Sequence, residues 1–175
     1  MTTTSTWHAG EQDTLLAAFA RVVADRPQHG FLDFAGELHS YGGFDRLTTR
    51  LAHGLAAIGV RAGDTVVTML DNSVDAVAAW FAINKLGAIS VPLNTALRGE
   101  FLRHQVCDAG SALVICEPDY LPRFAAIASQ LPQVRLLLHR GNLPAEPLSC
   151  PIAVAPLDAH RGTDESPIPV TVGPA

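Results

Sequence analysis

The chain has 175 residues, of which 48% are hydrophobic and 17% are charged. This composition suffices for one domain with a sizeable core and excludes a chain that is disordered throughout. The net charge of −5 and the scattered basic residues argue against nucleic acid and anionic lipid as partners. The longest uninterrupted hydrophobic run, 76–83, has eight residues, whereas a membrane-spanning helix needs about 20.

Cysteine content and the opening residues indicate a compartment. Cys107, Cys116 and Cys150 are too few for a disulfide scaffold, and an odd number cannot all pair within one chain. The opening MTTTSTWHAG has no basic segment followed by an apolar stretch, so we do not expect it to act as a secretory signal. Together these features predict a reducing, cytoplasmic location.

Proline content suggests how the chain is divided. Seven of the twelve prolines fall between Pro144 and Pro174, and each proline fixes φ and removes an N–H donor. We therefore predict a flexible N-terminal tail over 1–10, an α/β body over 11–140 and a proline-rich, extended tail over 141–175.

The first elements of the body are a helix, a hairpin and a second helix. An apolar stripe that includes Leu15 and Phe19 predicts a helix over 12–25. Residues 31–34 and 37–40 flank Ala35-Gly36 and suggest a small hairpin. The second helix begins near Tyr41, with Ser40 as its N-cap and Gly59 as its C-terminal stop.

Four apolar runs follow at a regular spacing. They are Thr65–Leu70, Ala88–Leu93, Ala112–Cys116 and Val134–Leu138, and their starts lie 23, 24 and 22 residues apart. Most are apolar on both faces, which is typical of strands covered on both sides. Helical spacing appears between them over 73–86, over 97–109 and again from Phe124 to Leu131. This alternation predicts an α/β fold with right-handed βαβ units and a parallel sheet covered by helices.

The sequence lacks the common short motifs for phosphate binding, nucleophilic catalysis and metal binding. It has no GxxxxGK[ST] or GxGxxG phosphate loop, no GxSxG elbow, and neither HExxH nor CxxC. His104 and Cys107 lie three residues apart on a predicted helix and could supply half of a zinc site. A structural zinc needs four ligands, and no second pair has suitable spacing. We therefore expect an ordinary surface histidine and a buried thiol, and we assign no metal ligand.

Polar residues follow each predicted strand, at the edge where parallel sheets bind ligands. They could face a ligand or cap the next helix, and we favour capping. They are Asp71-Asn72-Ser73, Asn94-Thr95, Glu117-Pro118-Asp119 and His139-Arg140.

Three further residues have alternative interpretations. Asp71 and Asp75 could share a proton or a cation on one helix face, although a solvated face is the favoured interpretation. Trp80 is expected in the core rather than as an aromatic platform for a ligand. We assign no catalytic and no cofactor-binding residue.

An ordered set of segments over 40–116 resembles the N-terminal region of the adenylate-forming superfamily, in particular the AMP-dependent acyl-CoA synthetases. Ser40-Tyr41 begins a helix, and Gly63-Asp64 begins a strand. A later helix ends in Lys85-Leu86-Gly87-Ala88, which leads to Val91-Pro92-Leu93-Asn94. The following NTALRGEFLRHQVCDAGSALVI resembles the subgroup of carnitine/crotonobetaine-, fatty-acid- and steroid-acid-type CoA ligases. The family's usual Glu after the Ser/Thr-Tyr pair is Gly42 here.

The resemblance implies that the chain is the truncated N-terminal subdomain of such an enzyme. Family members use ATP and Mg²⁺ to convert a carboxylate to an acyl-adenylate, and then transfer the acyl group to CoA. In the family, the lysine-containing phosphate loop, the nucleotide-binding motifs and the catalytic lysine all come after the matched region. We therefore expect the chain alone to bind none of these cofactors and to be inactive, with the downstream remainder of the enzyme as its partner.

Two expectations remain, one for the role of Lys85 and one for the alternative functions of the chain. Lys85 is the only lysine, and its expected role is to complement a helix dipole. The alternative functions are a non-catalytic partner subunit and a small-molecule-binding α/β domain.

Overall fold

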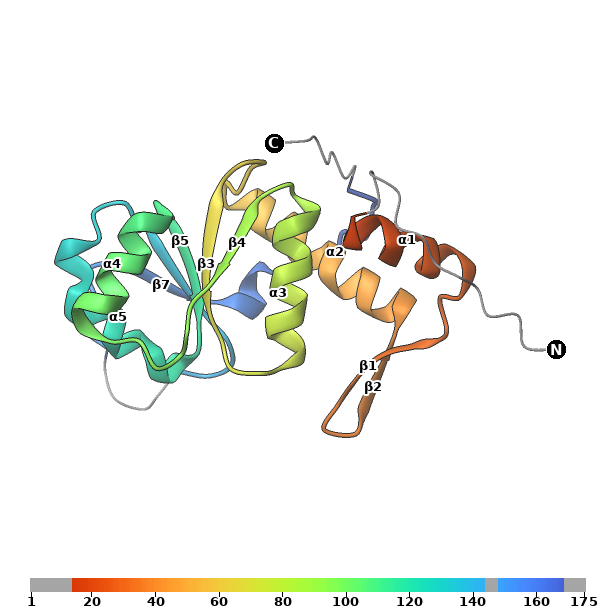
Figure 1. The fold of residues 1–175 in the computed structure, drawn as a ribbon, viewed down its shortest axis with the longest axis horizontal. Coiled ribbons are helices and arrows are strands. Elements are labelled where there is room, and N and C mark those ends of the chain that lie inside the picture. The colour runs from red at the N-terminus through yellow and green to blue at the C-terminus, as the bar shows by residue number, and fades with distance from the viewer. Residues whose placement is uncertain (1–13, 144–147, 169–175) are drawn as a thin grey trace.

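The computed structural model describes residues 14–143 and 148–168. A five-stranded parallel sheet with helices on both faces follows an N-terminal lead-in of helix, hairpin and long helix (Figure 1). The strands are β1 (Gly30–Phe34), β2 (Glu37–Ser40), β3 (Thr65–Met69), β4 (Ile89–Pro92), β5 (Leu113–Cys116), β6 (Leu136–His139) and β7 (Ala153–Pro156). The helices are α1 (Leu15–Asp25), α2 (Tyr41–Ala57), α3 (Val74–Lys85), α4 (Gly99–Ala109) and α5 (Leu121–Ile127).

Hydroxyl side chains begin three of the helices. The Oγ of Ser40 accepts from the backbone N of Gly43 at 3.1 Å, which confirms the predicted N-cap of α2. Thr14 and Ser73 cap α1 and α3 in the same way, and each accepts at 3.1 Å. Gly59 follows the end of α2 with φ at +105°, a conformation that favours glycine.

The order of strands in the sheet is β4-β3-β5-β6-β7, and every pairing is parallel. The four predicted apolar runs form β3 to β6, and α3, α4 and α5 lie in the crossovers. The prediction of a parallel βαβ sheet is therefore confirmed. All five carboxyl ends lie at one edge of the sheet, which is the edge used by ligands in this class of fold.

Part of the predicted extended tail over 141–175 has regular secondary structure, which the proline content did not indicate. Ala153–Pro156 forms β7, which pairs with β6 in the register Leu136↔Ala153 to His139↔Pro156. Pro156 is compatible with this position because it ends an edge strand, where a missing donor does not break the ladder. A 3₁₀ turn over Leu157–His160 follows β7. The predicted tail 1–10, and residues 144–147 and 169–175 of the other, lie outside the described residues.

Two apolar clusters pack on opposite faces of the sheet. On one face, α2 and α3 cover Val66, Ile115 and Leu138. On the other face, α4 and α5 cover Val67, Val114 and Leu137, so alternate residues of the strands point to opposite layers (Figure 1). This arrangement explains why these strands are apolar on both faces.

Aromatic rings join the lead-in to the first of these clusters. Phe19 on α1 lies 4.9 Å from Phe81 on α3, and Phe31 on β1 lies 5.0 Å from Phe44 on α2, measured between ring centroids. Trp80 differs from the expectation that it is a core residue. It is 39% exposed and contacts the ring of Phe81 edge-on, because it projects from the side of α3 that faces the open β4 edge.

Residues 157–168, here called the C-terminal strap, return across α2 and the start of α3. His53 Nε2 lies 2.9 Å from the carbonyl oxygen of Ser166. Arg161 pairs with Asp75 at 2.5 Å, and Ile168 packs against the cluster beneath α2 and α3. None of the helices in the described ranges has the length and apolar composition of a membrane-spanning segment.

Candidate functional site

The carboxyl edge of the sheet gathers three of the polar residues identified from the sequence. Glu117, at the end of β5, is only 6% exposed. Its Oε1 accepts from the backbone N of Asp71 at 3.1 Å, and both of its carboxylate oxygens lie 3.0 Å from Nε of Arg140. The carboxylate also holds the pKa of the Arg140 side chain above its usual value. Glu117 therefore fastens the ends of β3, β5 and β6 together.

Two residues that the sequence analysis missed complete this network. The hydroxyl of Tyr120 donates to Oδ1 of Asp71 at 2.7 Å, and this hydrogen bond raises the pKa of Tyr120. The guanidinium of Arg123 lies 4.2 Å from the centroid of the Tyr120 ring and donates to the carbonyl oxygen of Thr95 at 2.5 Å. Both residues follow the end of β5. Their position shortly after a strand was the one sequence signal that could have identified them as site residues.

Several of the other predicted residues satisfy backbone groups. Ser73 caps α3, and Oδ1 of Asn94 accepts from the backbone N of Ala96 at 2.8 Å. The capping interpretation is therefore confirmed for Ser73. Asn94 instead closes a turn within the loop before α4, whose first residue is Gly99. Asn72 and Asp119 are exposed.

The interpretation in which Asp71 and Asp75 share a proton or a cation is not supported by their partners. Asp71 accepts from Tyr120, whereas Asp75 pairs with Arg161 of the C-terminal strap. The favoured alternative, a solvated helix face, is also wrong for Asp75, because its side chain is 23% exposed and bound to a guanidinium. The strap could not be foreseen from the spacing of the two carboxylates.

His139 and Cys116 are buried neighbours in paired register positions of β6 and β5. Both ring nitrogens of His139 lack a hydrogen-bond partner among the described residues. Burial raises the pKa of the Cys116 thiol to about 12, with Glu117 and Cys150 adding to the effect. A thiol in this environment stays protonated at neutral pH and is a poor nucleophile.

His104 and Cys107, both on α4, have separate partners. His104 Nδ1 lies 3.3 Å from Asp108 Oδ1, and Cys107 Sγ lies 3.6 Å from the carbonyl oxygen of Gln130. In the described part of the chain, no group of three or more His, Cys, Asp or Glu residues could hold a metal ion. Cys107 is half-buried, so the expected buried thiol is only partly realised.

Lys85 is buried at the end of α3, where the sequence placed it, but its ion pair was missed. Its Nζ lies 2.7 Å from Oδ1 of Asp45 and 2.7 Å from Oγ1 of Thr49. Burial lowers the pKa of Lys85, although Asp45 opposes this effect. The lysine therefore fastens α3 to α2 and has little freedom to reach a ligand.

A cavity of about 430 Å³ lies beside this edge, between the hairpin, α2, α3 and the strap. Its charged lining residues carry both signs, and Arg140 and Arg161 are each paired with a carboxylate. The lining residues are Phe34, Glu37, His39, Leu47, Ser73, Val74, Asp75, Arg140 and Arg161.

This donor set does not fit a nucleoside triphosphate with Mg²⁺. Such a ligand needs cations free to meet phosphate charge and carboxylates free to hold the metal. At this edge Arg140 and Arg161 are bound to Glu117 and Asp75, and the only lysine is bound to Asp45. The geometry instead supports a structural role for the polar network.

Comparison with known proteins places the chain among enzymes of one kind. The family model for AMP-binding enzymes matches residues 19–167. The chain is 34% identical over 111 residues to 4-coumarate–CoA ligase 5 of Oryza sativa subsp. japonica, covering 63% of this chain and 21% of that protein. It is 30% identical over 131 residues to crotonobetaine/carnitine–CoA ligase of Salmonella arizonae, covering 73% of this chain and 25% of that protein.

Solved structures agree on the fold. A crystal structure of the anthranilate CoA ligase in complex with anthranoyl-AMP superposes with a TM-score of 0.72 at 23% identity, covering 90% of this chain and 28% of that one. The chain thus spans about a fifth to a quarter of the length of the curated relatives described above. Because the family model covers most of the sequence, this chain belongs to the AMP-binding enzyme family.

Proposed function

We propose that this chain is the N-terminal part of an AMP-dependent acyl-CoA ligase and serves a structural role in it. It would build the first parallel sheet and one wall of the cleft for the carboxylic acid. The supporting observation is the carboxyl edge, where the carboxylate of Glu117 accepts from the backbone N of Asp71 and from Nε of Arg140. A part of the sheet fastened in this way supplies rigidity to residues contributed by other segments.

We further propose that the chain alone does not catalyse adenylation. Formation of an acyl-adenylate develops charge on phosphate oxygens, and cations and oriented donors must meet that charge. The only lysine is buried against Asp45, and Arg140 and Arg161 are paired with carboxylates. ATP, Mg²⁺ and CoA would therefore bind to the remainder of the enzyme, in the same or in a separate chain. The odd number of cysteines supports a cytoplasmic location.

ATP–pyrophosphate exchange tests the proposed inactivity. The purified chain is assayed with the acids named in its relatives, such as 4-coumarate, crotonobetaine and long-chain fatty acids. We expect no exchange above a heat-inactivated control. Exchange that depends on one of the acids would overturn the proposal.

The coding frame after the Ala175 codon tests the other part of the proposal, which is that the chain is the N-terminal part of a longer enzyme. If the frame continues into a Ser/Thr/Gly-rich loop that contains a lysine, the structural role within one chain is supported. If a stop codon follows directly, the role within one chain is wrong and a separate partner chain must supply the chemistry.

A partner-subunit function is the second candidate, and an exposed apolar surface favours it. Trp80 is 39% exposed and Ile89 on the edge strand β4 is 53% exposed. A hollow of about 320 Å³ beside Trp80 is lined largely by apolar side chains from α3 and from the ends of β3 and β4. Such a surface is typical of an interface. Light scattering tests it: a monodisperse monomer whose behaviour is unchanged in Trp80→Lys would count against this function.

The third candidate function is a small-molecule-binding domain that uses the polar residues after the strands. The carboxyl edge gives it no support. Its polar groups are engaged with one another, as at Glu117 and Arg140. Calorimetry tests this function. If titration of the chain with ATP, CoA and fatty acids produces no binding heat, the small-molecule function is wrong.

A further inference from the structure

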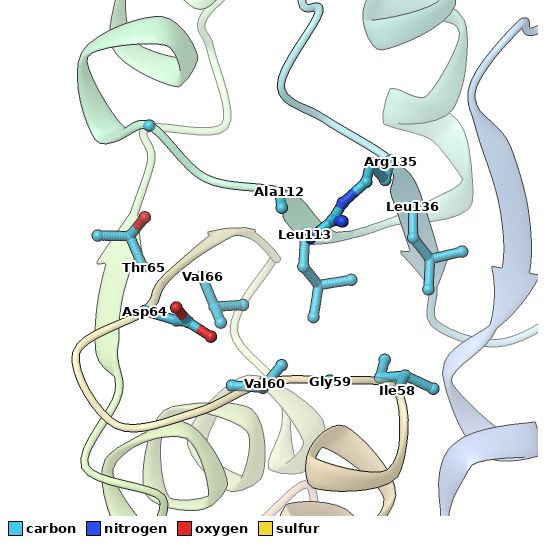
Figure 2. A pocket seen from close by; sticks show the side chains of 11 residues that line it. Ile58, Gly59, Val60, Asp64, Thr65, Val66, Ala112, Leu113, Arg135 and Leu136 are labelled. Carbon is cyan, nitrogen blue, oxygen red and sulfur yellow. The ribbon is translucent and has the colours of Figure 1, made fainter.

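A second cavity, here called the amino-edge cavity, opens at the opposite end of the sheet from the polar network (Figure 2). It lies where β3, β5 and β6 begin, between the end of α2 and the loop after α4. Its volume of about 430 Å³ falls within the usual size range of small-molecule sites. It is lined by Ile58, Gly59, Val60, Asp64, Thr65, Val66, Gly110, Ala112, Leu113, Arg135 and Leu136.

The floor of this cavity is apolar. Val60, Val66 and Leu113 are buried members of the core cluster beneath α2, and Leu136 packs against the same cluster. Gly59 and Gly110 border the opening, and a Cβ built at either position would meet no atom within 4 Å. The cavity is therefore an open hollow against one edge of the hydrophobic core.

Arg135 supplies a positive charge at the mouth of the cavity. Its backbone N donates to the carbonyl oxygen of Ala112 at 2.9 Å, which fixes the position of its backbone beside β5. The side chain runs from the start of β6 toward Leu113, so the guanidinium lies above the apolar floor (Figure 2). Arg135 is exposed, and within the described ranges no carboxylate pairs with it.

The other polar lining side chains each bind a backbone group. Oδ2 of Asp64 accepts from the backbone N of Arg61 at 2.8 Å, and the hydroxyl of Thr65 donates to the carbonyl oxygen of Ala109 at 2.7 Å. The guanidinium of Arg135 is the positively charged group among the lining residues, and Asp64 lies on the other side of the cavity from it (Figure 2). A guanidinium binds carboxylates through two parallel hydrogen bonds.

We propose that the amino-edge cavity is a binding site for a small monocarboxylate with a short alkyl chain. The carboxylate would pair with the guanidinium of Arg135, and the alkyl chain would lie over Leu113 and Leu136. Both interactions are needed, because an exposed ion pair alone contributes little. The site lies at the far edge of the sheet from the polar network and does not depend on the proposed ligase function.

Calorimetric titration with sodium hexanoate tests the proposal on the full chain. We expect saturable binding with a Kd on the order of a millimolar, as befits a ligand of so few atoms. Hexan-1-ol lacks the charge and acetate lacks the apolar chain, so each should bind at least about tenfold more weakly.

Variants locate the binding. Arg135→Gln should weaken hexanoate binding about tenfold or more, and Ala112→Leu should abolish it by filling the cavity while keeping the guanidinium. Arg46→Gln is the matched control, because Arg46 is another exposed arginine and lies on α2 away from the cavity. Circular dichroism confirms that each variant is folded.

The proposal is overturned if hexanoate produces no saturable heat, if Arg135→Gln binds as tightly as the original chain, or if hexan-1-ol binds equally well. It is equally overturned if folded Ala112→Leu retains the affinity. Loss of binding in Arg135→Gln and in Ala112→Leu, with Arg46→Gln unchanged, supports it.

Discussion

Gly54 on α2 and His160 in the C-terminal strap come closer than any side chain at residue 54 would allow. A Cβ on residue 54 would stand 1.5 Å from the carbonyl oxygen of His160 and 2.7 Å from its carbonyl carbon. These are backbone atoms, so the clash cannot be relieved by rotating a side chain. The strap is held close by the His53–Ser166 contact and by the ion pair between Arg161 and Asp75. The absence of a side chain at Gly54 therefore permits the strap to lie on α2.

Gly54→Ala is expected to lower the free energy of unfolding by about 1–3 kcal/mol, because the strap or the helix must move apart. Urea denaturation measures the change, and limited proteolysis should show faster cleavage within 157–168. Gly162→Ala is the matched control on the same strap, because its nearest atoms would be 3.9 Å away. If Gly54→Ala matches the control in both assays, the close approach is not important for stability.

Lys85 makes stability depend on pH in the alkaline range. Burial lowers its pKa in the folded chain from the ordinary 10.5. The unfolded chain therefore binds more protons in the window between the lowered pKa and 10.5, so stability rises with pH across that window. Below the lowered pKa the lysine is protonated in both states and this contribution is constant.

Lys85→Met removes this dependence, and the comparison with the original chain isolates it from other alkaline groups. We expect the denaturation midpoint of the original chain, relative to Lys85→Met, to rise with pH between the two pKa values. The variant also leaves Asp45 without its cation, so it should be less stable at neutral pH, by about 1–3 kcal/mol. Arg46→Met on the exposed side of α2 serves as the control. A constant difference between original and variant across the alkaline range would contradict the assigned cause.

Much of the fold could be predicted because its strands are strongly apolar and regularly spaced. β3 to β6 stand out as runs bounded by polar residues, and Ser40 marks a helix start by its own hydroxyl. β7 could not be found in this way. Its four residues Ala153–Pro156 end in a proline and closely follow Pro151. Their strand conformation depends on pairing with β6, which local sequence does not encode.

The candidate site was predictable residue by residue but not as a network. Polar residues after strands are expected to cap the next helix, and Ser73 does so, whereas Asn94 binds a backbone N–H of its own loop. The partners of the carboxylates come from distant segments: Asp75 and Arg161 are 86 residues apart, and Asp71 and Tyr120 are 49 apart. Such pairs follow from tertiary packing and leave no spacing pattern in the sequence. For Lys85 likewise, the sequence predicts the position at the end of a helix but not the ion pair with Asp45 on α2.

Cys116 is expected to resist alkylation in the folded chain. Its pKa is raised to about 12 by burial, so almost no thiolate exists at pH 8, and the side chain is inaccessible. Cys107 and Cys150 are half-buried and should react first. Mass spectrometry after a brief iodoacetamide pulse measures each site, and a pulse in urea is the control in which all three should react. Rapid labelling of Cys116 without urea would show that β5 is open to solvent.

The ion pair between Glu117 and Arg140 should respond unequally to loss of either partner. The side chain of Glu117 is 7% exposed, whereas that of Arg140 is 35% exposed. Arg140→Met would leave a buried carboxylate with only the backbone N–H of Asp71 as partner, so we expect a loss of about 1–3 kcal/mol. Glu117→Gln removes the buried charge and keeps an oxygen for that N–H, while Arg140 can turn to water.

The loss for Glu117→Gln should therefore stay below about 1 kcal/mol. Urea denaturation of both variants and of the double variant completes a cycle, in which adding Glu117→Gln to Arg140→Met should restore part of the lost stability. The restoration follows because the second change removes the charge that the first change stranded. A double variant less stable than Arg140→Met would show that the carboxylate is not stranded, and that the strand ends are held together by packing instead.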